Sequence, residues 1–179
     1  MQGWWSDTIR EHLPELDDVA IAEHLLELDV FSEEEQSDVT VYPGVHALLG
    51  ALPQYRWTVV TSASEKIMHR RLAAVGIVAP RHAVGGDSVV QGKPHPEGYL
   101  RGAAILSRQP EECLVLEDAP AGIRAAKAAR CPVLAIASSH PVEELQEADW
   151  IVRSLDQIQV SIDETATLKI QFPALQRSR

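Results

Sequence analysis

The chain has 179 residues, of which 26 are Asp or Glu and 16 are Lys or Arg, so its net charge is −10. This length predicts one domain with at most a small satellite, and an apolar fraction of 45% excludes a disordered or fibrous chain. An acidic surface repels phosphate backbones and anionic lipid headgroups, so neither nucleic acid nor a membrane is expected as a partner.

The cysteine count and the N-terminus indicate a cytoplasmic location. Two cysteines, Cys113 and Cys131, are too few for a disulfide scaffold and are expected to be small buried hydrophobes in a reducing compartment. No segment has the roughly 18 apolar residues needed to span a bilayer. The first residues have neither the basic nor the apolar region of a signal peptide.

Residues 1–41 are predicted to be a separate helical unit. A short helix over 7–13 is ended by Pro14, and apolar residues recur at helical spacing after Asp18. Ser32 with Glu35 forms a capping-box pattern for a further turn. This unit carries most of the acidic excess, on a face expected to be solvated.

From residue 42 to 179, short apolar runs alternate with helical patterns, which predicts an α/β fold with a parallel sheet. The predicted helices cover residues 45–52, 64–75, 96–106, 122–129 and 141–147. The predicted strands cover residues 57–60, 83–84, 113–116, 133–137 and 150–152. The segments 157–162 and 165–172 alternate around Asp163-Glu164, which predicts a hairpin at the edge of the sheet.

Ligands of open parallel sheets bind beyond the carboxyl ends of the strands, and polar residues follow three of the predicted strands. At the first, the hydroxyls of Thr61, Ser62 and Ser64 stand between a strand and a helix start. Backbone N–H groups and the helix dipole suit a phosphate there. Capping explains the same residues equally well, because Ser62 with Glu65 fits a capping box and Ser64 fits an N-cap.

The second candidate is Lys93, in the loop Gly-Lys-Pro-His-Pro at 92–96. The loop is not a phosphate-binding P-loop, because Asp87 and Pro94 stand where that motif needs Gly and Ser or Thr. Two prolines would stiffen the loop and hold the ammonium group of Lys93 toward an anion. A lysine before a helix is also commonly just solvated.

The third candidate is the pair Glu117 and Asp118, which ends an apolar strand. Mg²⁺ prefers hard oxygen ligands and takes one or two carboxylates with several waters. Asp118 could instead cap the next helix, with Pro120 in its first turn, but capping explains one acid and not the pair. The histidines at 69, 82 and 140 lack metal-ligand spacing and are expected at the surface.

Taken in order, four motifs resemble those of the haloacid dehalogenase superfamily, and most closely its β-phosphoglucomutase-like and sugar-phosphate phosphatase branch. They are Tyr-Pro-Gly (42–44), Val-Val-Thr-Ser (59–62), Gly-Lys-Pro-x-Pro-x-Gly-Tyr (92–99) and Leu-Glu-Asp-Ala-Pro-Ala-Gly (116–122). The resemblance runs from about residue 3 to 160. It implies a Rossmann-like core over 42–179 and, over 1–41, part of the α-helical cap that closes over the substrate.

The resemblance also implies roles for individual residues. Thr61 and Ser62, with nearby backbone amides, would bind the transferring phosphoryl group, and Lys93 would neutralise the nucleophile and the phosphoryl oxygens. Asp118 would ligate Mg²⁺, with Glu117 supporting the metal shell. The substrate would be a small phosphorylated metabolite, a sugar or polyol phosphate, and the full-length protein would be a monomer.

The family's first motif, Asp-x-Asp-Gly-Thr or a variant, is absent from this sequence. Its first Asp attacks phosphorus to form an aspartyl-phosphate and its second is the general acid and base. It follows a central strand, between the strands that here end at Thr61 and Asp118. Such a strand, with three or four buried side chains at 1.5–3 kcal/mol each, contributes roughly 5–10 kcal/mol. We therefore expect this chain to be N-terminally truncated and inactive as it stands.

Three other functions are compatible with parts of the pattern. A phosphomutase of the same family would use the same aspartyl-phosphate. A non-catalytic pseudo-enzyme would bind phosphorylated ligands or a partner chain, but its site is expected to decay, and Thr61, Lys93, Glu117 and Asp118 are all present. A receiver domain of a response regulator would need an acidic residue at an early strand end, where this chain has Val60-Thr61.

Overall fold

The computed structural model describes residues 17, 39–164 and 167–175. The helices predicted within residues 1–38 lie outside the described residues, apart from Asp17, so the cap boundary at residue 41 stays a prediction. The first described helix is α3 (Val45–Gly50). It follows Gly44, whose φ of 92° and close approach to the backbone of Asp156 leave no room for a Cβ atom.

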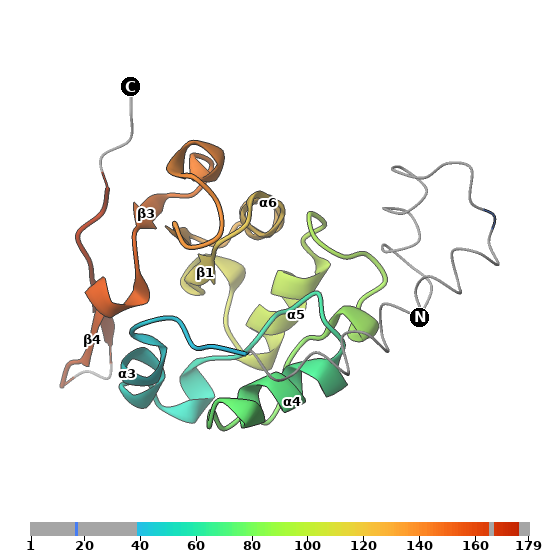
Figure 1. The fold of residues 1–179 in the computed structure, drawn as a ribbon, viewed down its shortest axis with the longest axis horizontal. Helices are drawn as coiled ribbons and strands as arrows, with labels where there is room; N and C mark the ends of the chain where they lie inside the picture. Colours follow the sequence, from blue (N-terminus) through green and yellow to red (C-terminus); the bar gives the residue numbers. More distant parts are fainter. Residues whose placement is uncertain (1–16, 18–38, 165–166, 176–179) are drawn as a thin grey trace.

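The core of the fold contains a parallel sheet of three strands in the order β1-β2-β3, of which Figure 1 labels β1 and β3. The strands are β1 (Val115–Glu117), β2 (Val133–Ile136) and β3 (Trp150–Val152). Leu134 of β2 pairs with Leu116 on one side and with Trp150 on the other. All four residues of β2 are buried, as expected for a strand covered on both faces. This arrangement confirms the predicted α/β fold with a parallel sheet.

The alanine-rich helix α6 (Pro120–Ala128) connects β1 to β2 and packs on both strands and on α5 (Glu97–Ile105). Pro120 lies in its first turn, where a missing N–H group costs nothing. Ile123 is fully buried, and burial of such a side chain stabilises the fold by about 1.5–3 kcal/mol. The core below this helix is formed by apolar side chains of both layers: Ile123, Ala125, Ala126, Val133, Ala135, Leu145, Ala148 and Ile151.

A second part of the sheet is reduced to one parallel bridge between Val60 and Val84. It precedes α4 (Glu65–Ala74), which begins after its N-cap Ser64 and is followed by Gly76 with a φ of 70°. The predicted strands at 57–60 and 83–84 are therefore present only as this bridge. Among the described residues, no strand pairs with residues 57–60 beyond this bridge.

A cavity of about 1270 Å³ separates this bridge from β1. Residues 57–60 line one side of it, and residues 114–118 line the other. Among the described residues, no ladder joins the two parts of the sheet. The space lies between the strand ends at Thr61 and Asp118.

Three short helices have the 3₁₀ geometry near the sheet: η2 (Gly86–Ser88), η3 (Pro110–Glu112) and η4 (Val142–Leu145). The helix predicted over 141–147 is present but shorter, because only the four residues of η4 are helical. Pro141 precedes η4 and its carbonyl accepts from Glu144 N at 3.0 Å, a tight i→i+3 turn. The strand predicted over 113–116 is shifted, because Cys113 still donates to Pro110 and Glu117 pairs with Ala135.

The C-terminal hairpin is confirmed, but its predicted pairing at the edge of the sheet is wrong, because it forms a separate two-stranded sheet. Strands β4 (Gln159–Ile162) and β5 (Leu168–Gln171) are antiparallel and pair with each other rather than with β3. Beyond β5, Leu175 N donates to Ile151 O at 2.8 Å, so the chain after the hairpin runs along the outer side of β3. The remaining short helices are η1 (Gln54–Arg56) and η5 (Leu155–Gln157).

The two cysteines are free thiols, of which Cys131 is buried and Cys113 half-buried. Burial raises the pKa of Cys131 to about 11, with further contributions from Cys113 and Glu111. Burial, with Glu112, also raises the pKa of Cys113. Both thiols are therefore protonated and unreactive at neutral pH, as expected for small buried hydrophobes.

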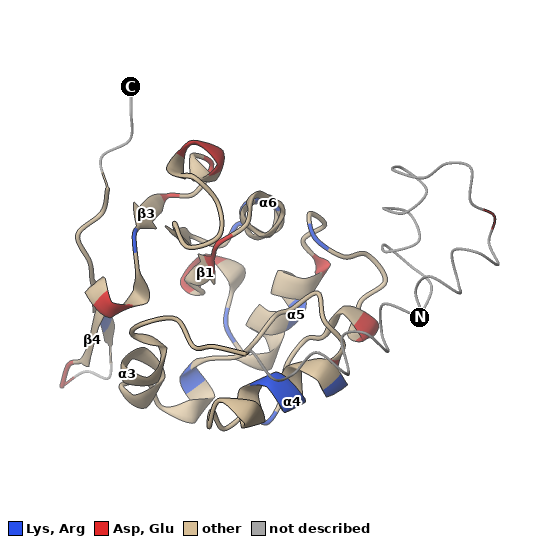
Figure 2. Ribbon diagram, viewed as in Figure 1, with Lys and Arg blue, Asp and Glu red and all other residues tan. Residues whose placement is uncertain are grey.

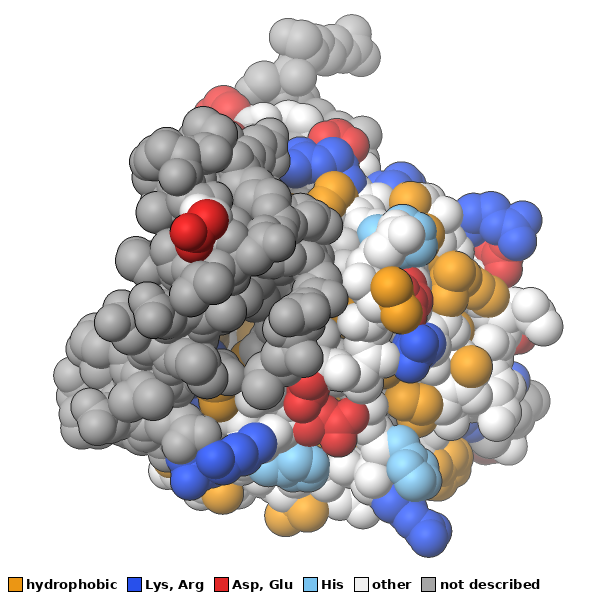
Figure 3. Space-filling view, turned by 90° about the vertical axis from the view of Figure 1, so that its right-hand side faces the viewer, with side chains coloured by type: hydrophobic (Ala, Val, Ile, Leu, Met, Phe, Trp, Pro, Cys, Tyr) orange, Lys and Arg blue, Asp and Glu red, His pale blue; other side chains and the backbone are white. Residues whose placement is uncertain are grey.

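Basic side chains gather on α4, which carries Lys66, Arg70 and Arg71 (Figure 2). On the face shown in Figure 3, the Lys and Arg side chains of the described residues are separated by acidic, apolar and neutral ones.

Within the part of the chain that the structure describes, no helix is long and apolar enough to cross a bilayer.

Candidate active site

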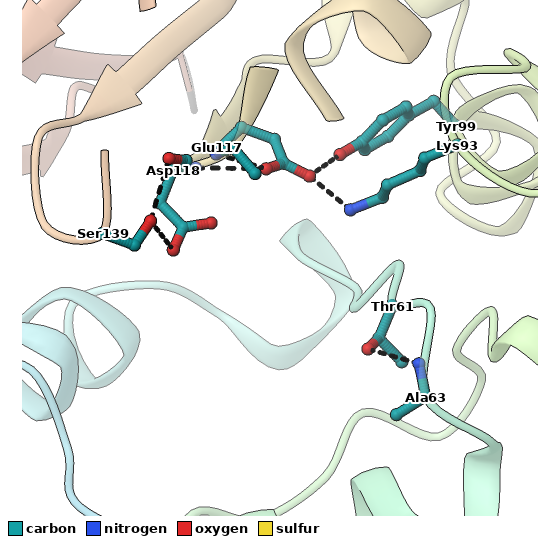
Figure 4. A network of polar contacts seen from close by, with 8 residues as sticks. Thr61, Ala63, Lys93, Tyr99, Glu117, Asp118 and Ser139 are labelled. Atoms are coloured by element: carbon teal, nitrogen blue, oxygen red, sulfur yellow. Dashed lines mark hydrogen bonds and ion pairs between the residues drawn. The ribbon is translucent and has the colours of Figure 1, made fainter. Parts of the chain in front are cut away.

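The Glu117 carboxylate at the end of β1 forms the centre of the candidate site (Figure 4). It is 7% exposed and is the one buried charged side chain among the described residues. Its Oε1 atom accepts hydrogen bonds from Lys93 Nζ and from Tyr99 Oη, the latter at 2.5 Å. Its Oε2 atom accepts from the backbone N–H groups of Asp118 at 3.1 Å and Ala119 at 3.3 Å. Both carboxylate oxygens are thus engaged by protein donors.

These contacts fix the charge state of the site. Burial alone would raise the pKa of Glu117, but the Lys93 ammonium and the hydrogen bonds from Lys93, Tyr99 and Ala119 outweigh it and lower that pKa. Burial, together with the negative charge of Glu117, raises the pKa of the Tyr99 hydroxyl well above its usual range. Glu117 is therefore ionised at neutral pH, and Tyr99 stays a hydrogen-bond donor.

A set of polar contacts holds the loop that carries Lys93 against α5. The Glu97 carboxylate accepts hydrogen bonds from Val90 N and Gln91 N, the shortest of them at 2.9 Å. Arg101, one turn later, contacts Glu97 at 2.7 Å and donates to the carbonyl of Ser88 at 2.5 Å. The N–H groups of Gln91 and Val90 lower the pKa of Glu97, so its carboxylate remains an acceptor. The loop that carries Lys93 is therefore fixed at residues 88–91. Its two prolines, Pro94 and Pro96, would stiffen it further.

The cation on this loop has two fixed contacts. Besides its ion pair with Glu117, Lys93 lies over the ring of Tyr99, with 5.2 Å between Nζ and the ring centroid. Its side chain is 21% exposed. These contacts hold the Lys93 side chain in place, and its role toward an anion stays a prediction. The Nζ group has three donors, and the pair with Glu117 leaves others for an anion.

Gly122 of α6 makes room for the Glu117 carboxylate. A Cβ atom at this position would overlap the carboxylate carbon and both of its oxygens. The glycine lies in the first turn of α6, directly after the segment Glu117–Pro120 that leaves β1. Close approach of helix and carboxylate thus depends on the absence of a side chain at this one position.

Asp118 lies beside this centre and is held by the loop after β2. Ser139 Oγ donates to Asp118 Oδ2 at 2.8 Å and lies 3.0 Å from the Asp118 carbonyl oxygen. His140 Nδ1 lies 2.9 Å from Ser139 Oγ and 3.0 Å from the same carbonyl oxygen. The alternative of Asp118 as a helix cap is wrong, because Ala119 is the N-cap of α6 and no side chain caps it. The Asp118 side chain instead lines the large cavity.

Thr61 and Ser62 face Lys93 across a small cavity of about 20 Å³, which all three residues line. Thr61 is fixed on both sides, since its N–H group donates to Val84 O at 2.9 Å and its Oγ1 atom accepts from Ala63 N at 3.1 Å. The neighbouring Ser64 caps α4 by accepting from Ile67 N at 3.4 Å. Capping therefore accounts for Ser64, whereas Thr61 and Ser62 line the small cavity beside Lys93.

Comparison with known proteins identifies the family. The family of haloacid dehalogenase-like hydrolases matches residues 2–130. Hexitol phosphatase A of Escherichia coli K12 is 34% identical over 166 residues, which are 92% of this chain and 77% of that protein. The chain belongs to the haloacid dehalogenase-like hydrolase family. Glycerol-1-phosphate phosphohydrolase 2 of Saccharomyces cerevisiae is also 34% identical, over 95% of this chain and 72% of its own.

Solved structures confirm the fold of the family. A hydrolase from Pseudomonas syringae superposes with a TM-score of 0.77 at 22% identity, over 86% of this chain and 75% of that one. The β-phosphoglucomutase of Clostridium difficile superposes with a TM-score of 0.70 at 23% identity, over 87% and 73%. Together with the relatives, these matches confirm the predicted family and its sugar-phosphate phosphatase branch.

The structure brings together the residues that the motifs of this haloacid dehalogenase-like hydrolase predict. Lys93 contacts Glu117 directly and shares a cavity with Thr61 and Ser62, and Asp118 follows Glu117 in the chain. Their roles with phosphate and metal stay predictions. The geometry gives Glu117 one role that the motifs did not, because its carboxylate positions Lys93.

Three residues of the site were not predicted to take part. Tyr99 lies in the Gly-Lys-Pro-x-Pro-x-Gly-Tyr motif, but the motif gives it no role. Its role becomes visible only in the structure, where its hydroxyl donates to the buried Glu117 carboxylate. Ser139 and His140 follow the carboxyl end of β2, so the rule that selected the other strand ends would also have selected them. The prediction of surface histidines holds for His69 and His82, which are exposed, but His140 is half-buried against Asp118.

The donor set fits a Mg²⁺ ion in part. Among the described residues, no group of three or more His, Cys, Asp or Glu side chains could hold a metal ion. Mg²⁺ nevertheless needs only one or two protein carboxylates when waters and a substrate phosphate complete its shell. Asp118 offers one such oxygen, Oδ1, whereas both oxygens of Glu117 are engaged by protein donors.

Proposed function

We propose that this chain is most of the catalytic core of a Mg²⁺-dependent phosphatase that hydrolyses small sugar or polyol phosphates. The observation that carries the proposal is the fixed Lys93 ammonium, held by Glu117 and Tyr99 beside Thr61, Ser62 and Asp118. Phosphoryl transfer depends mainly on positioning and on stabilising negative charge, which such a cluster provides.

Several residues would bind the phosphoryl group together. Lys93 binds its oxygens with the donors that Glu117 leaves, and the hydroxyls of Thr61 and Ser62 bind it from the opposite side of the small cavity. The start of α4 adds a favourable helix dipole. Asp118 would hold Mg²⁺, which supplies charge neutralisation for the phosphoryl oxygens.

The nucleophile lies outside this sequence. No Asp-x-Asp pattern occurs anywhere in the 179 residues, and the large cavity between residues 57–60 and β1 supports a further strand there. Hydrolysis through an aspartyl-phosphate therefore needs a carboxylate from a strand of a longer polypeptide. We infer that the chain as it stands is N-terminally truncated and inactive.

The substrate class rests on the relatives. Their names include hexitol phosphatase, glycerol-1-phosphate phosphohydrolase and 2-deoxyglucose-6-phosphate phosphatase. These substrates are phosphate esters of sugars or of polyols, and the cluster around Lys93 is built for the phosphoryl group they share. A phosphomutase would use the same cluster, and a protein that only binds phosphorylated ligands would lack the nucleophile, as this sequence does.

A fusion protein that carries an added N-terminal strand distinguishes the phosphatase from the mutase and from the binding protein. A segment with an apolar strand and Asp-x-Asp-Gly-Thr is joined to the N-terminus, and the product is assayed on glycerol 1-phosphate, a hexitol phosphate, a hexose 6-phosphate and a nucleoside monophosphate with Mg²⁺. Release of inorganic phosphate from the first three, faster than from the nucleotide, supports the proposal. An isomerised hexose phosphate without released phosphate identifies a mutase, and no turnover on any of them identifies a binding protein; either result overturns it.

A further inference from the structure

The motif Gly-Lys-Pro-x-Pro-x-Gly-Tyr contains one polar residue without a role, which is His95 at the first x. It follows Lys93 by two residues and is exposed to solvent. Even so, His95 is one of the residues that line the small cavity, together with Lys93, Thr61 and Ser62. The imidazole therefore belongs to the solvent-accessible side of the cavity that also holds the Lys93 ammonium.

The backbone holds His95 at a fixed place relative to Lys93. His95 N donates to Gly92 O at 2.9 Å, which closes a tight turn whose two central residues are Lys93 and Pro94. On the other side, Pro96 is the N-cap of α5, and its ring fixes the φ angle, which is −73°. The turn and the proline thus fix the chain before and after His95.

A hydrogen bond to the ring determines which nitrogen of His95 carries the proton. Glu97 N donates to His95 Nδ1 at 3.3 Å. Because a backbone N–H group can only donate, Nδ1 is the unprotonated nitrogen of the neutral ring, and the proton is on Nε2. This contact satisfies one N–H group at the start of α5, so helix capping explains the role of Nδ1. It does not explain Nε2–H, for which the described residues provide no acceptor.

The lining of the small cavity suits an anion. It includes the Lys93 ammonium and the hydroxyls of Thr61 and Ser62, and none of the described residues that line it is Asp or Glu. This is a marked contrast with a chain whose net charge is −10. A neutral Nε2–H group on His95 adds a further donor to this lining without adding a second charge beside Lys93.

We propose that His95 is a further phosphate-binding residue, whose Nε2–H group donates to an oxygen of the phosphoryl group bound by Lys93, Thr61 and Ser62. This inference rests on the proposed function and adds a residue to the same site. The ligand is a phosphate monoester or inorganic phosphate, whose charged oxygens form stronger hydrogen bonds than neutral acceptors do. Phosphate binding requires no nucleophile, so it can be measured separately from hydrolysis.

Two substitutions in the full chain with the fused strand distinguish the two ring nitrogens. His95→Asn keeps an acceptor near the Nδ1 position for Glu97 N but has no donor at the Nε2 position, whereas His95→Gln has an amide N–H there. Calorimetric titration with inorganic phosphate should show an affinity about 10–100-fold lower in His95→Asn, as expected for a lost hydrogen bond to a charged group. His95→Gln should recover most of it. His82→Asn is the matched control, because His82 is exposed and lines neither cavity, and it should bind as the parent does.

A second measurement needs no substitution at His95. Nuclear magnetic resonance of the ¹⁵N-histidine-labelled fused protein, at about pH 8.5 where an ordinary imidazole is neutral, should show a protonated Nε2 and an unprotonated Nδ1. Added phosphate should shift the Nε2 signal of His95 and leave that of His82 unchanged.

Several outcomes overturn the proposal. A protonated Nδ1, or an Nε2 signal that stays unchanged while phosphate binds, would show that His95 does not contact the anion. Weaker binding in His95→Gln than in His95→Asn would show that His95 acts only as a helix cap. Hydrolysis of sugar phosphates with parental phosphate affinity in His95→Asn would overturn this inference and leave the proposed function standing. Phosphate binding through His95 without hydrolysis of any ester would support the inference and overturn the proposed phosphatase.

Discussion

At the scale of single residues, the Glu117 carboxylate links the sheet to the loop of Lys93. Its four donors come from the side chains of Lys93 and Tyr99 and from the backbone of Asp118 and Ala119. Removing one member of a buried ion pair leaves the other charge uncompensated, which costs more than the pair contributes. Substituting Lys93 or Glu117 alone should therefore destabilise the fold more, for each residue changed, than substituting both together.

Lys93 and Glu117 are predicted to be strongly coupled. In the chain with the fused strand, Lys93→Met and Glu117→Gln should each lower the free energy of unfolding by about 3–5 kcal/mol. The double variant should lose clearly less than the sum, because neither charge is then left alone. Urea unfolding of the four proteins measures this, and additive losses would show that the ion pair contributes nothing.

The same carboxylate predicts a pH dependence. Its pKa is lowered in the folded state, so the stability it contributes is present above its ordinary pKa of about 4.3 and is lost as the pH falls through the lower folded value. The free energy of unfolding of the fused protein should fall below about pH 4.3 less steeply in Glu117→Gln than in the parent. Equal slopes below that pH would contradict a lowered pKa.

Ser139 is predicted to position Asp118 for the metal. Its hydroxyl donates to Asp118 Oδ2, and loss of such an outer contact typically weakens metal affinity about 10–100-fold. Mn²⁺ titration of the fused protein, followed by electron paramagnetic resonance, should show this loss in Ser139→Ala and recovery in Ser139→Thr. Ser138→Ala is the matched control, since no side-chain hydrogen bond of Ser138 to the described residues is seen. Equal weakening in both variants would exclude the positioning role.

At the scale of elements, α6 must approach β1 at one glycine. Gly122→Ala would place a methyl group on the Glu117 carboxylate and is predicted to cost about 1–3 kcal/mol or more, with lower activity of the fused protein. Gly50→Ala at the end of α3 is the control, because no atom lies within 4 Å of its Cβ position. It should be neutral or stabilise by about 0.5–1 kcal/mol. Thermal unfolding decides, and equal effects would refute the close contact.

The sequence predicts best those helices and strands whose neighbours in the fold belong to the described chain. The sequence predicts β2 as a strand over 133–137 and α6 as a helix over 122–129, each within two residues of its observed ends. It does so because the strand is apolar throughout and the helix is rich in alanine. Residues 57–60 are also mostly apolar but form only one bridge, because strand pairing depends on neighbours that a local apolar pattern does not reveal. The role of Tyr99 could not be predicted, because it depends on a partner 18 residues away in the sequence.

At the scale of the whole molecule, the sheet is in two parts. The core around β2 is packed on both faces, whereas a cavity of about 1270 Å³ lies between residues 57–60 and residues 114–118, with the exposed Leu116 at its wall. Buried parallel strands contribute both apolar burial and backbone hydrogen bonds. The loss of one central strand is comparable with the whole stability of a domain, about 5–15 kcal/mol.

The chain alone is therefore predicted to be poorly soluble or molten. It should keep helical far-UV circular dichroism but show weak near-UV signals, bind anilinonaphthalene sulfonate and unfold without a sharp transition. The fused protein is the control and should unfold cooperatively. A sharp thermal transition in the monomeric unfused chain would show that the missing strand matters less than we infer.

The central claim is that this chain holds a phosphatase site complete except for its nucleophile. The most direct measurement is Mg²⁺-dependent phosphate release from p-nitrophenyl phosphate and a hexose phosphate by the unfused chain, the fused chain and the fused Asp118→Ala variant. We predict turnover only by the fused parent, because Asp118 would hold the metal and the fused segment supplies the attacking carboxylate. Robust Mg²⁺-dependent turnover by the unfused chain, lost in its own Asp118→Ala variant, would contradict the claim and reveal another nucleophile.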